Sequence, residues 1–384
     1  MLSFEHYLPV RLIFGRGKIA QVGKVTSQYG KKALIATGKS STKKTGLLDK
    51  VIAFLQEEKV DYVVFDQVEQ NPLTTTVSEG VKIVQEQGCD VIIGLGGGSS
   101  MDCAKGIAFS AVNPGDISDY IFGKPGSGAL PIIAITTTAG TGSEGDCFAV
   151  LTNPVTKDKK SLKTPLVYPK ASIVDPELMT TLPPKIIAST GIDALCHSIE
   201  AYSSQKCQPF TEMMALMAIE LVSKNLPKVY DNPQDLEAWD GMALANTLGG
   251  MCIDCSGVTL PHALEHPVSG LLDVVHGQGL AALILPVMEY SYPAAPEKFA
   301  KMAKAMGKNI EGLPLEKAAA KSVEAMKRLL TRVNLTLTLK DLGVTEEKID
   351  WLAENTLKIM NVAVENNPKV ADLADIKELY RQSL

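Results

Sequence analysis

Two patterns of apolar residues divide the chain near residue 183. Before that point, short runs rich in β-branched residues predict buried strands at residues 32–37, 62–65, 91–95, 131–136 and 171–174. Between the first three of them, apolar residues three and four positions apart predict helices at residues 43–58 and 74–87. Strands that alternate with helices over short connections predict a parallel sheet with right-handed crossovers.

The second half of the chain has a helical pattern throughout. Amphipathic segments predict helices at residues 186–203, 210–224, 236–252, 280–290, 299–306, 315–330, 346–356 and 374–384. Prolines and glycines are expected to fall between these segments, at Pro227, Pro233, Pro261, Pro293 and Gly307. We therefore expect an α/β domain over residues 1–183 and an all-α domain over residues 184–384.

A glycine-rich turn follows the strand predicted at residues 91–95. The chain reads Gly-Gly-Gly-Ser-Ser-Met-Asp over residues 96–102 and then continues as a helix. This order brings backbone N–H groups and a helix N-terminus up to a phosphate, because no Cβ blocks the approach. The segment matches neither G-x-G-x-x-G nor the P-loop pattern. A tight turn without a ligand remains the alternative.

A second polar loop follows the strand predicted at residues 131–136. Residues 136–144 read Thr-Thr-Thr-Ala-Gly-Thr-Gly-Ser-Glu, which places five hydroxyl groups and two glycines in nine residues. This composition suits a pyrophosphate or a ribose better than a hydrophobic core. In a parallel sheet both loops lie at the carboxyl ends of strands, where ligands bind. The two loops together predict a nucleotide site.

Four of the five histidines fall within one stretch of 80 residues inside the helical half. Asp193 and His197 are four residues apart, and so are His262 and His266, so each pair shares a helix face. His276 follows ten residues later. A lone histidine is ordinarily structural, but a carboxylate with several imidazoles suits Fe(II), Zn(II), Co or Ni rather than Ca or Mg. The spacing leaves open which three of the four histidines bind the metal.

The cysteines offer a weaker alternative metal site. Cys252 and Cys255 form a single CxxC with no second pair, which excludes a zinc ribbon, and we expect them to be structural. Cys196 is adjacent to His197 but projects about 100° away from it around the helix, so we expect it to pack in the core.

Composition narrows the class of protein. The chain has 384 residues, and its 38 basic and 43 acidic side chains give a net charge of −5, which argues against a nucleic-acid binder. No apolar run reaches the ~18–20 residues of a membrane span, and charged residues near the start exclude the apolar core of a signal peptide. Seven scattered cysteines disfavour a disulfide framework. We expect a cytoplasmic enzyme that binds neither nucleic acid nor membrane.

Taken together, the motifs resemble the iron-containing (group III) alcohol dehydrogenases, especially their NADP-type, butanol-dehydrogenase-like members. The resemblance covers essentially the whole chain. It rests on FGRG at 14–17, NP at 71–72, GGGSxxD at 96–102, TTxGTGSE at 137–144, DP at 175–176, GxDALxHxxE at 191–200, HALEHP at 262–267 and HGxG at 276–279. It implies a dehydroquinate-synthase-like fold, in which a Rossmann-like dinucleotide-binding α/β domain precedes an all-helical metal-binding domain.

The resemblance also implies roles for individual residues. The implied metal ligands are Asp193, His197, His262 and His276. His266 is left unligated near the nicotinamide, as a catalytic group that relays the alcohol proton to solvent. The implied pyrophosphate loop is Gly97, Gly98 and Ser99, with Thr137, Thr138 and Thr141 on the diphosphate and nicotinamide side and Asn71 on the adenosine side. A family lysine in the segment after a β-hairpin aligns with Lys159, although Lys160 is next to it.

One position bears on the choice of cofactor. NAD-preferring relatives carry an Asp after the first strand, where it bonds to the ribose 2′-OH and repels a 2′-phosphate. This chain has Gly38 there, and Lys39, Ser40 and Ser41 offer hydrogen-bond donors. The resemblance therefore favours NADP(H) over NAD(H). The alternative is that Gly38 only makes the turn.

The expected function is reversible hydride transfer between NAD(P)H and a small aldehyde or primary alcohol. Fe(II), or alternatively Zn(II), would act as a Lewis acid, and relatives of this kind are commonly homodimers. The alternatives are a lactaldehyde- or glycerol-type polyol dehydrogenase, a dehydroquinate-synthase-like lyase, and a binding protein that has lost the chemistry. The lyase would need basic residues beside the metal motifs, whereas Lys206, Lys224 and Lys228 are not adjacent to them. The binding protein would be expected to have lost metal ligands.

Overall fold

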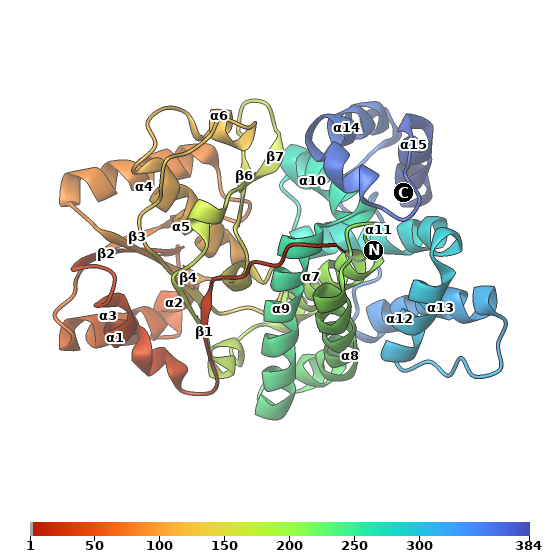
Figure 1. The fold of residues 1–384 in the computed structure, drawn as a ribbon, viewed down its shortest axis with the longest axis horizontal. Coiled ribbons are helices and arrows are strands. Elements are labelled where there is room, and N and C mark those ends of the chain that lie inside the picture. The colour runs from red at the N-terminus through yellow and green to blue at the C-terminus, as the bar shows by residue number, and fades with distance from the viewer. Residues whose placement is uncertain (1–2) are drawn as a thin grey trace. The chain divides into compact units, whose positions relative to one another are not determined.

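The computed structural model describes residues 3–384, and the chain divides into two compact units (Figure 1). The α/β unit comprises residues 8–138 and 142–181, and the helical unit comprises residues 3–7, 139–141 and 182–384. The main change of unit lies next to the predicted boundary at residue 183. The two short segments differ from the prediction because Gly140 packs against Thr190 and His6 stacks on Phe210, both in the helical unit.

A parallel sheet forms the centre of the α/β unit, in the strand order β1-β8-β5-β4-β2-β3. Its strands are β1 (Arg11–Phe14), β2 (Lys32–Gly38), β3 (Asp61–Val68), β4 (Val91–Gly96), β5 (Ile132–Thr136) and β8 (Ala171–Val174). All five strands predicted from apolar runs are therefore present. The sequence did not predict β1, because only four residues pair there, at the edge of the sheet beside β8.

Alternate residues of the strands enter two different cores. Leu34 and Ala36 belong to the core shared with α4 (Thr74–Gln87) and α5 (Gly98–Ser110). Ala33 and Ile35 belong to the core shared with α1 (Val22–Thr26) and α3 (Leu47–Glu57). Helices thus cover both faces of the sheet, which explains why its strands appear in the sequence as continuous apolar runs.

The helix predicted at residues 43–58 is two helices in the structure. A short helix α2 (Ser41–Lys44) ends before Gly46, and α3 begins at Leu47. Gly46 has a φ of +70°, a left-handed conformation that interrupts the helical path and that glycine adopts without strain. The prediction was therefore wrong about a single continuous helix, whereas the prediction for residues 74–87 matches α4.

The strand order of the sheet reverses between β2 and β4, because β3 adds on one side of β2 and β4 adds on the other. Strands β2 and β4 are neighbours, with Thr37 opposite Leu95, although β3 lies between them in sequence. The loops after their carboxyl ends are the turn at Gly38 and the glycine turn at Gly96. Ligands of doubly wound sheets bind at the carboxyl ends of strands where such a reversal occurs. The fold therefore brings two of the predicted nucleotide-binding segments to one edge.

A hairpin of β6 (Phe148–Thr152) and β7 (Lys159–Lys163) completes the α/β unit, together with the short helix α6 (Ile117–Ile121). A fully buried lysine on α5 holds the segment before the hairpin. Lys105 Nζ donates to Asp146 Oδ1 at 2.7 Å, to the Ser143 carbonyl at 2.7 Å and to the Phe148 carbonyl at 2.8 Å. Asp102, one helical turn earlier, accepts from the Ser143 hydroxyl at 2.7 Å. Two buried ionic side chains thus connect the glycine turn's helix to the loop after β5.

We expect Lys105→Met to lower the free energy of unfolding of the α/β unit by about 3–5 kcal/mol, because it leaves the Asp146 carboxylate buried without its cation. Urea titrations followed by far-UV circular dichroism measure this change. Tryptophan fluorescence is unsuitable for the α/β unit, because both tryptophans, Trp239 and Trp351, lie in the helical unit. Lys43→Met is the matched control, because the Lys43–Asp66 pair is exposed and its loss should cost under about 1 kcal/mol. A Lys105→Met cost as small as the control's would contradict the prediction.

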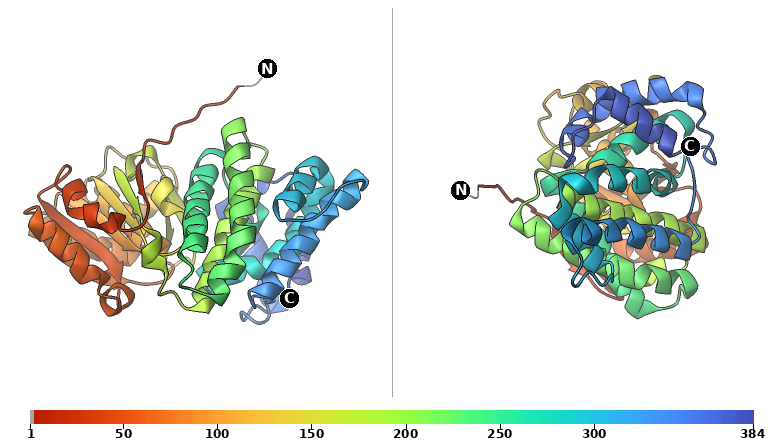
Figure 2. Two further views of the ribbon diagram at one scale, coloured as in Figure 1. Left: turned by 90° about the horizontal axis from the view of Figure 1, so that it is seen from below. Right: turned by 90° about the vertical axis from the view of Figure 1, so that its right-hand side faces the viewer.

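The helical unit contains nine α-helices among the described residues. They are α7 (Pro184–Ser203), α8 (Pro209–Asp231), α9 (Leu236–Ser256), α10 (Leu260–Leu272), α11 (His276–Ser291), α12 (Pro296–Ala305), α13 (Leu315–Arg332), α14 (Ile349–Glu365) and α15 (Leu373–Gln382). Figure 2 shows α7, α8 and α9 packed side by side. A separate core forms where α10 and α11 meet α14 and α15.

Two of the prolines expected between helices lie within them. Pro227 is inside α8, where the buried residues Leu226 and Val229 hold the helix on both sides of it. Pro261 is in the first turn of α10, where its missing N–H would have had no helical partner. Among residues 3–384, no helix combines the length and apolar character needed to cross a bilayer.

Candidate functional site

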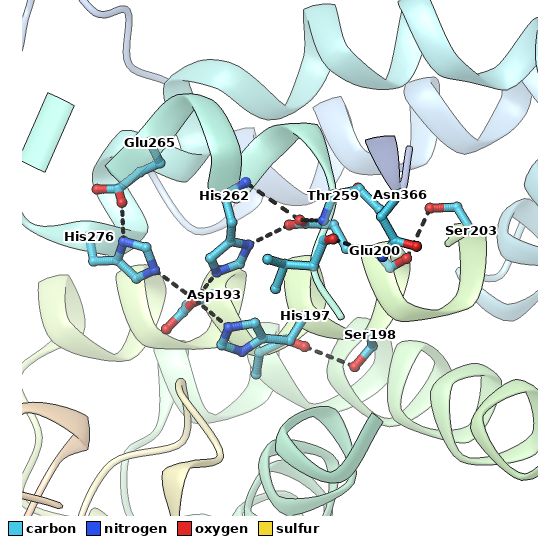
Figure 3. Close-up of polar contacts among 12 residues, drawn as sticks. Asp193, His197, Ser198, Glu200, Ser203, Thr259, His262, Glu265, His276 and Asn366 are labelled. Atoms are coloured by element: carbon cyan, nitrogen blue, oxygen red, sulfur yellow. Dashed lines mark hydrogen bonds and ion pairs between the residues drawn. The ribbon is translucent and has the colours of Figure 1, made fainter. Parts of the chain in front are cut away.

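Three imidazoles converge on one carboxylate in the helical unit (Figure 3). Asp193 and His197 are on α7, His262 is on α10, and His276 is the first residue of α11. Asp193 Oδ1 lies 3.5 Å from Nε2 of His262, 3.6 Å from Nε2 of His276 and 3.7 Å from Nε2 of His197. The residues implied as metal ligands therefore come together, with the same ring nitrogen of each histidine toward Asp193.

The opposite ring nitrogen of each histidine has a hydrogen-bond acceptor. His262 Nδ1 lies 2.6 Å from Glu200 Oε1, and His276 Nδ1 bonds to Glu265 Oε2. His197 Nδ1 lies 3.3 Å from the carbonyl of Gly140. An oxygen acceptor requires an N–H at Nδ1, so the neutral form of each imidazole has its lone pair on Nε2, directed toward the centre of the cluster.

Charge inside the cluster favours a cation. Burial raises the pKa of the Asp193 carboxyl, but the neighbouring imidazoles outweigh burial and hold that pKa below its ordinary value. Burial lowers the pKa of His262, yet the carboxylates of Glu200 and Asp193 outweigh it and raise that pKa to about 10. For His197, burial dominates and lowers the pKa. Three buried carboxylates, with Glu265 as the third, thus surround the histidines.

The donor set fits a divalent transition metal. Asp193 Oδ1 and His262 Nε2 are buried atoms with no hydrogen-bond partner, although they point at each other. Such atoms are costly to bury unless something binds them. Asp193, His262 and His276 offer ligand atoms that all lie within 4.8 Å of one another. One carboxylate and imidazole nitrogens match the preferences of Fe(II) and Zn(II).

His266 lies beside the cluster and belongs to a second possible grouping. It is buried on α10, with its ring centroid 6.1 Å from that of His262 and 5.7 Å from that of His276. Glu265, His266 and His276 also place ligand atoms within 4.8 Å of one another. The assignment of His266 as a proton relay stays a prediction.

The predicted phosphate loop has the geometry that anion binding requires. Gly97 is the N-cap of α5, and Gly98 and Ser99 form its first turn. A Cβ on Gly97 would lie 3.0 Å from Thr138 Oγ1, so the two polar loops approach closely at a residue without a side chain. Thr137 N donates to the Gly96 carbonyl at 2.9 Å. This backbone cradle at a helix N-terminus fits a diphosphate.

The remaining predicted cofactor residues are more dispersed. Gly38 ends β2, and Ser40 and Ser41 begin α2 beyond it. Asn71 is buried and has a φ of +49°. Thr141 lies in the short segment assigned to the helical unit, whereas Thr137 and Thr138 belong to the α/β unit.

The lysine aligned from the family lies elsewhere than expected. Lys159 is the first residue of β7, so it belongs to the hairpin's second strand and not to a segment after the hairpin. It is buried, and its charge lowers the pKa of Asp102, which burial raises. Lys160 faces another way, with its Nζ 5.2 Å from the Phe122 ring centroid. Lys159 and Lys160 are consecutive residues of β7, and successive side chains of a strand point to opposite faces.

Sequence reasoning missed the roles of Glu200, Glu265 and Lys105. Glu200 lies three residues after His197, and Glu265 lies three after His262, spacings that place each on the ligand-bearing face of its helix. That signal was available within the quoted motifs. The burial of Lys105 had no such signal, because its partners are 38 or more residues away. Cys196 and Cys252 are buried, and no disulfide joins cysteines in the described part of the chain.

Comparison with known proteins agrees with the geometry. The family model described as iron-containing alcohol dehydrogenase matches residues 9–176, and the one described as Fe-containing alcohol dehydrogenase family, C-terminal, matches residues 187–384. The chain is 38% identical to 1,3-propanediol dehydrogenase of Citrobacter freundii over 99% of this chain and 98% of that one. It is 36% identical to NAD-dependent methanol dehydrogenase of Bacillus methanolicus, over 98% of this chain and 99% of that one.

Solved structures show the same relationship. The alcohol dehydrogenase ADH/D1 of an archaeal halo-thermophile from a Red Sea brine pool covers 100% of both chains with a TM-score of 0.95 and 38% identity. Both matched family models describe dehydrogenases, which leaves the lyase alternative without support. The chain therefore belongs to the iron-containing alcohol dehydrogenase family, as an oxidoreductase of alcohols and aldehydes that uses a metal and a nicotinamide cofactor.

Proposed function

We propose that Asp193, His197, His262 and His276 hold one Fe(II), with Zn(II) as the alternative ion, and that the enzyme prefers NADP(H). The observation that carries the metal assignment is the convergence of three Nε2 atoms within 3.5–3.7 Å of Asp193 Oδ1. A metal bound there would supply Lewis-acid polarisation of the oxygen of a small aldehyde or primary alcohol. The nicotinamide would supply or accept the hydride.

The chain's own residues bind, orient and exclude water. The cluster is buried on all but the His276 side, so a substrate oxygen would approach a site with little bulk water. The glycine turn at Gly97 and the hydroxyl groups of Thr137 and Thr138 would hold the diphosphate. His266 would accept and release the alcohol proton, because an imidazole whose lone pair binds a metal is a poor proton acceptor and His266 is the buried histidine outside the proposed ligand set.

An initial-rate screen tests this proposal. Short aldehydes are reduced with NADPH or with NADH, using enzyme freed of metal and then reloaded with Fe(II) or Zn(II). We expect activity to depend on the added ion and to be higher with NADPH. Elemental analysis of anaerobically purified protein should give about one divalent ion per chain. Full activity in protein without metal would refute the proposed site.

A diol substrate is the second candidate. The observation in its favour is the 38% identity to 1,3-propanediol dehydrogenase of Citrobacter freundii. Adding 1,3-propanediol and glycerol to the oxidation screen, beside short primary alcohols, separates the two. The cytoplasmic location stays a prediction from the composition of the sequence, and the homodimer stays a prediction of the family resemblance.

We expect Gly38→Asp to shift the cofactor preference from NADPH toward NADH by about ten- to hundredfold in the ratio of kcat/KM values, equivalent to about 1–3 kcal/mol. The added carboxylate would repel a 2′-phosphate and accept from a ribose 2′-OH. A Cβ fits there, since its nearest neighbours are the Val68 carbonyl at 3.7 Å and Ser41 Oγ at 4.0 Å.

Gly38→Asn is the matched control for this change, because it adds the same volume without the charge. It should move the ratio much less than Gly38→Asp does. Two relatives are named NAD-dependent methanol dehydrogenase and NADH-dependent butanol dehydrogenase B, so the cofactor preference of the unmodified enzyme must be measured first. If it already prefers NADH several-fold, the argument from Gly38 is wrong.

A further inference from the structure

Two buried glutamates connect the ligand histidines to the rest of the helical unit (Figure 3). Glu200 and Glu265 are both fully buried, and each bonds to the Nδ1 atom of one histidine, His262 or His276. Neither glutamate points an oxygen at the position where the Nε2 atoms converge. Burying a carboxylate is costly unless each oxygen has partners, so these two side chains call for an explanation.

Glu200 has partners for both oxygens. Its Oε1 lies 2.6 Å from His262 Nδ1, and its Oε2 accepts from the backbone N–H of Thr259 at 2.7 Å. Thr259 is the N-cap of α10, so the carboxylate also occupies the N-terminal end of the helix that carries His262. Glu200 thereby fixes the ring orientation of His262 and the position of its helix together.

Glu265 has a separate set of partners. Its Oε2 bonds to His276 Nδ1, and its Oε1 accepts from the hydroxyl of Ser269. A Cβ on Gly279 would lie 2.8 Å from Glu265 Cγ, so the absence of a side chain at Gly279 makes room for the glutamate. Glu265 on α10 thus orients the histidine that begins α11.

We propose that Glu200 and Glu265 are positioning residues of the metal site, which hold His262 and His276 in the Nδ1–H form with Nε2 toward the metal and strengthen both imidazoles as donors. This inference rests on the metal site proposed above. A carboxylate behind a ligating imidazole fixes its tautomer and raises its basicity. His197 provides an internal comparison, because its Nδ1 faces only the neutral carbonyl of Gly140.

The test measures metal affinity directly. Protein freed of metal is titrated with Zn(II) in competition with a chelator, and Co(II) absorption reports the geometry of the site. We expect Glu265→Gln to weaken Zn(II) binding by about tenfold, because an amide oxygen still accepts from Nδ1–H but carries no charge. Glu265→Leu removes the acceptor as well, so we expect about hundredfold weakening and a changed Co(II) spectrum.

The two glutamates require different substitutions. At Glu265, the Ser269 hydroxyl can turn to accept from the amide of a glutamine, so Glu265→Gln should fold. At Glu200, the NH₂ group of a glutamine could face the backbone N–H donors of Thr259 and His262, which would destabilise the start of α10. The thermal unfolding of Glu200→Gln is therefore compared with that of wild type, both without metal. Glu354→Gln, at an exposed glutamate on α14 in the same unit, controls for the loss of one negative charge.

Each outcome bears on a different statement. Wild type that binds no Zn(II) would overturn the proposed metal site itself. If wild type binds Zn(II) and both Glu265 variants match it within twofold, the positioning role is refuted. Two ions per chain in wild type and one in Glu265→Leu would also refute it, because Glu265 would then be a ligand together with His266 and His276. Weaker binding and an altered Co(II) spectrum with unchanged unfolding would support it.

Discussion

Replacing His262 by alanine is expected to empty the metal site and to lower kcat by at least about 10²–10³-fold, the effect of removing the group that stabilises charge in the transition state. His262, one of the proposed ligands, lies between two acidic side chains: its Nε2 is 3.5 Å from Asp193 Oδ1 and its Nδ1 is 2.6 Å from Glu200 Oε1. Without its ring, the buried carboxyl groups of Asp193 and Glu200 both lose the imidazole that they contact.

Metal content by elemental analysis and kcat on one aldehyde, measured on the same preparation, check this expectation. His6→Ala is the matched control, because His6 is the one histidine outside residues 197–276 and its loss should change neither quantity. Circular dichroism of both variants and of metal-free wild type separates loss of metal from loss of fold. A His262→Ala enzyme that keeps its metal and its activity would show that another histidine holds the ion.

Replacing His266 by glutamine is expected to leave the metal content near that of wild type and to lower kcat by about 10- to 10³-fold, the usual range for a general acid–base group. The Nε2 atoms that lie 3.5–3.7 Å from Asp193 Oδ1 belong to His197, His262 and His276, whereas His266 lies on α10 one turn after His262. An imidazole whose lone pair binds a metal is a poor proton acceptor, so a relay needs a separate histidine.

The dependence of kcat on pH provides the second readout for His266. Because imidazole is the side chain that ordinarily changes charge near neutral pH, its removal should alter the profile there. His262→Ala and His266→Gln should therefore differ in kind, one in metal content and the other in pH dependence. If His266→Gln loses its metal while His262→Ala retains it, the two roles are reversed.

The α/β half was predictable because its signals are local. Strands such as β2 and β4 are short apolar runs that end in glycine. A continuous apolar run indicates that both faces of the sheet are covered. The edge strand β1 escaped prediction because a four-residue strand carries little periodicity of its own. β1 pairs with β8, which lies about 160 residues further along the chain, and nothing in residues 11–14 themselves indicates that partner.

In the helical half, local signals placed eight of the nine described helices, missed α10, and placed several helix ends poorly. A proline is a reliable stop signal only when nothing holds the helix beyond it. At Pro227 the burial of Leu226 and Val229 outweighs the loss of one hydrogen bond, so α8 continues to Asp231. Packing energy contributed by distant residues therefore overrides the local preference, which is why the end of α8 was placed too early.

By itself, the sequence determined the fold class, the family and the residue types of the metal cluster. Periodicity, turn residues and i, i+4 spacing depend on only a few neighbouring residues, so they can be recognised without knowing which distant residues are in contact. The tertiary structure alone decided which ring nitrogen of each histidine faces Asp193 and which acceptors hold the other nitrogen. Glu200 and His262 are 62 residues apart, and they meet only because α7 and α10 pack together. A hydrogen bond across that separation depends on packing and on burial, and no spacing within a motif encodes either.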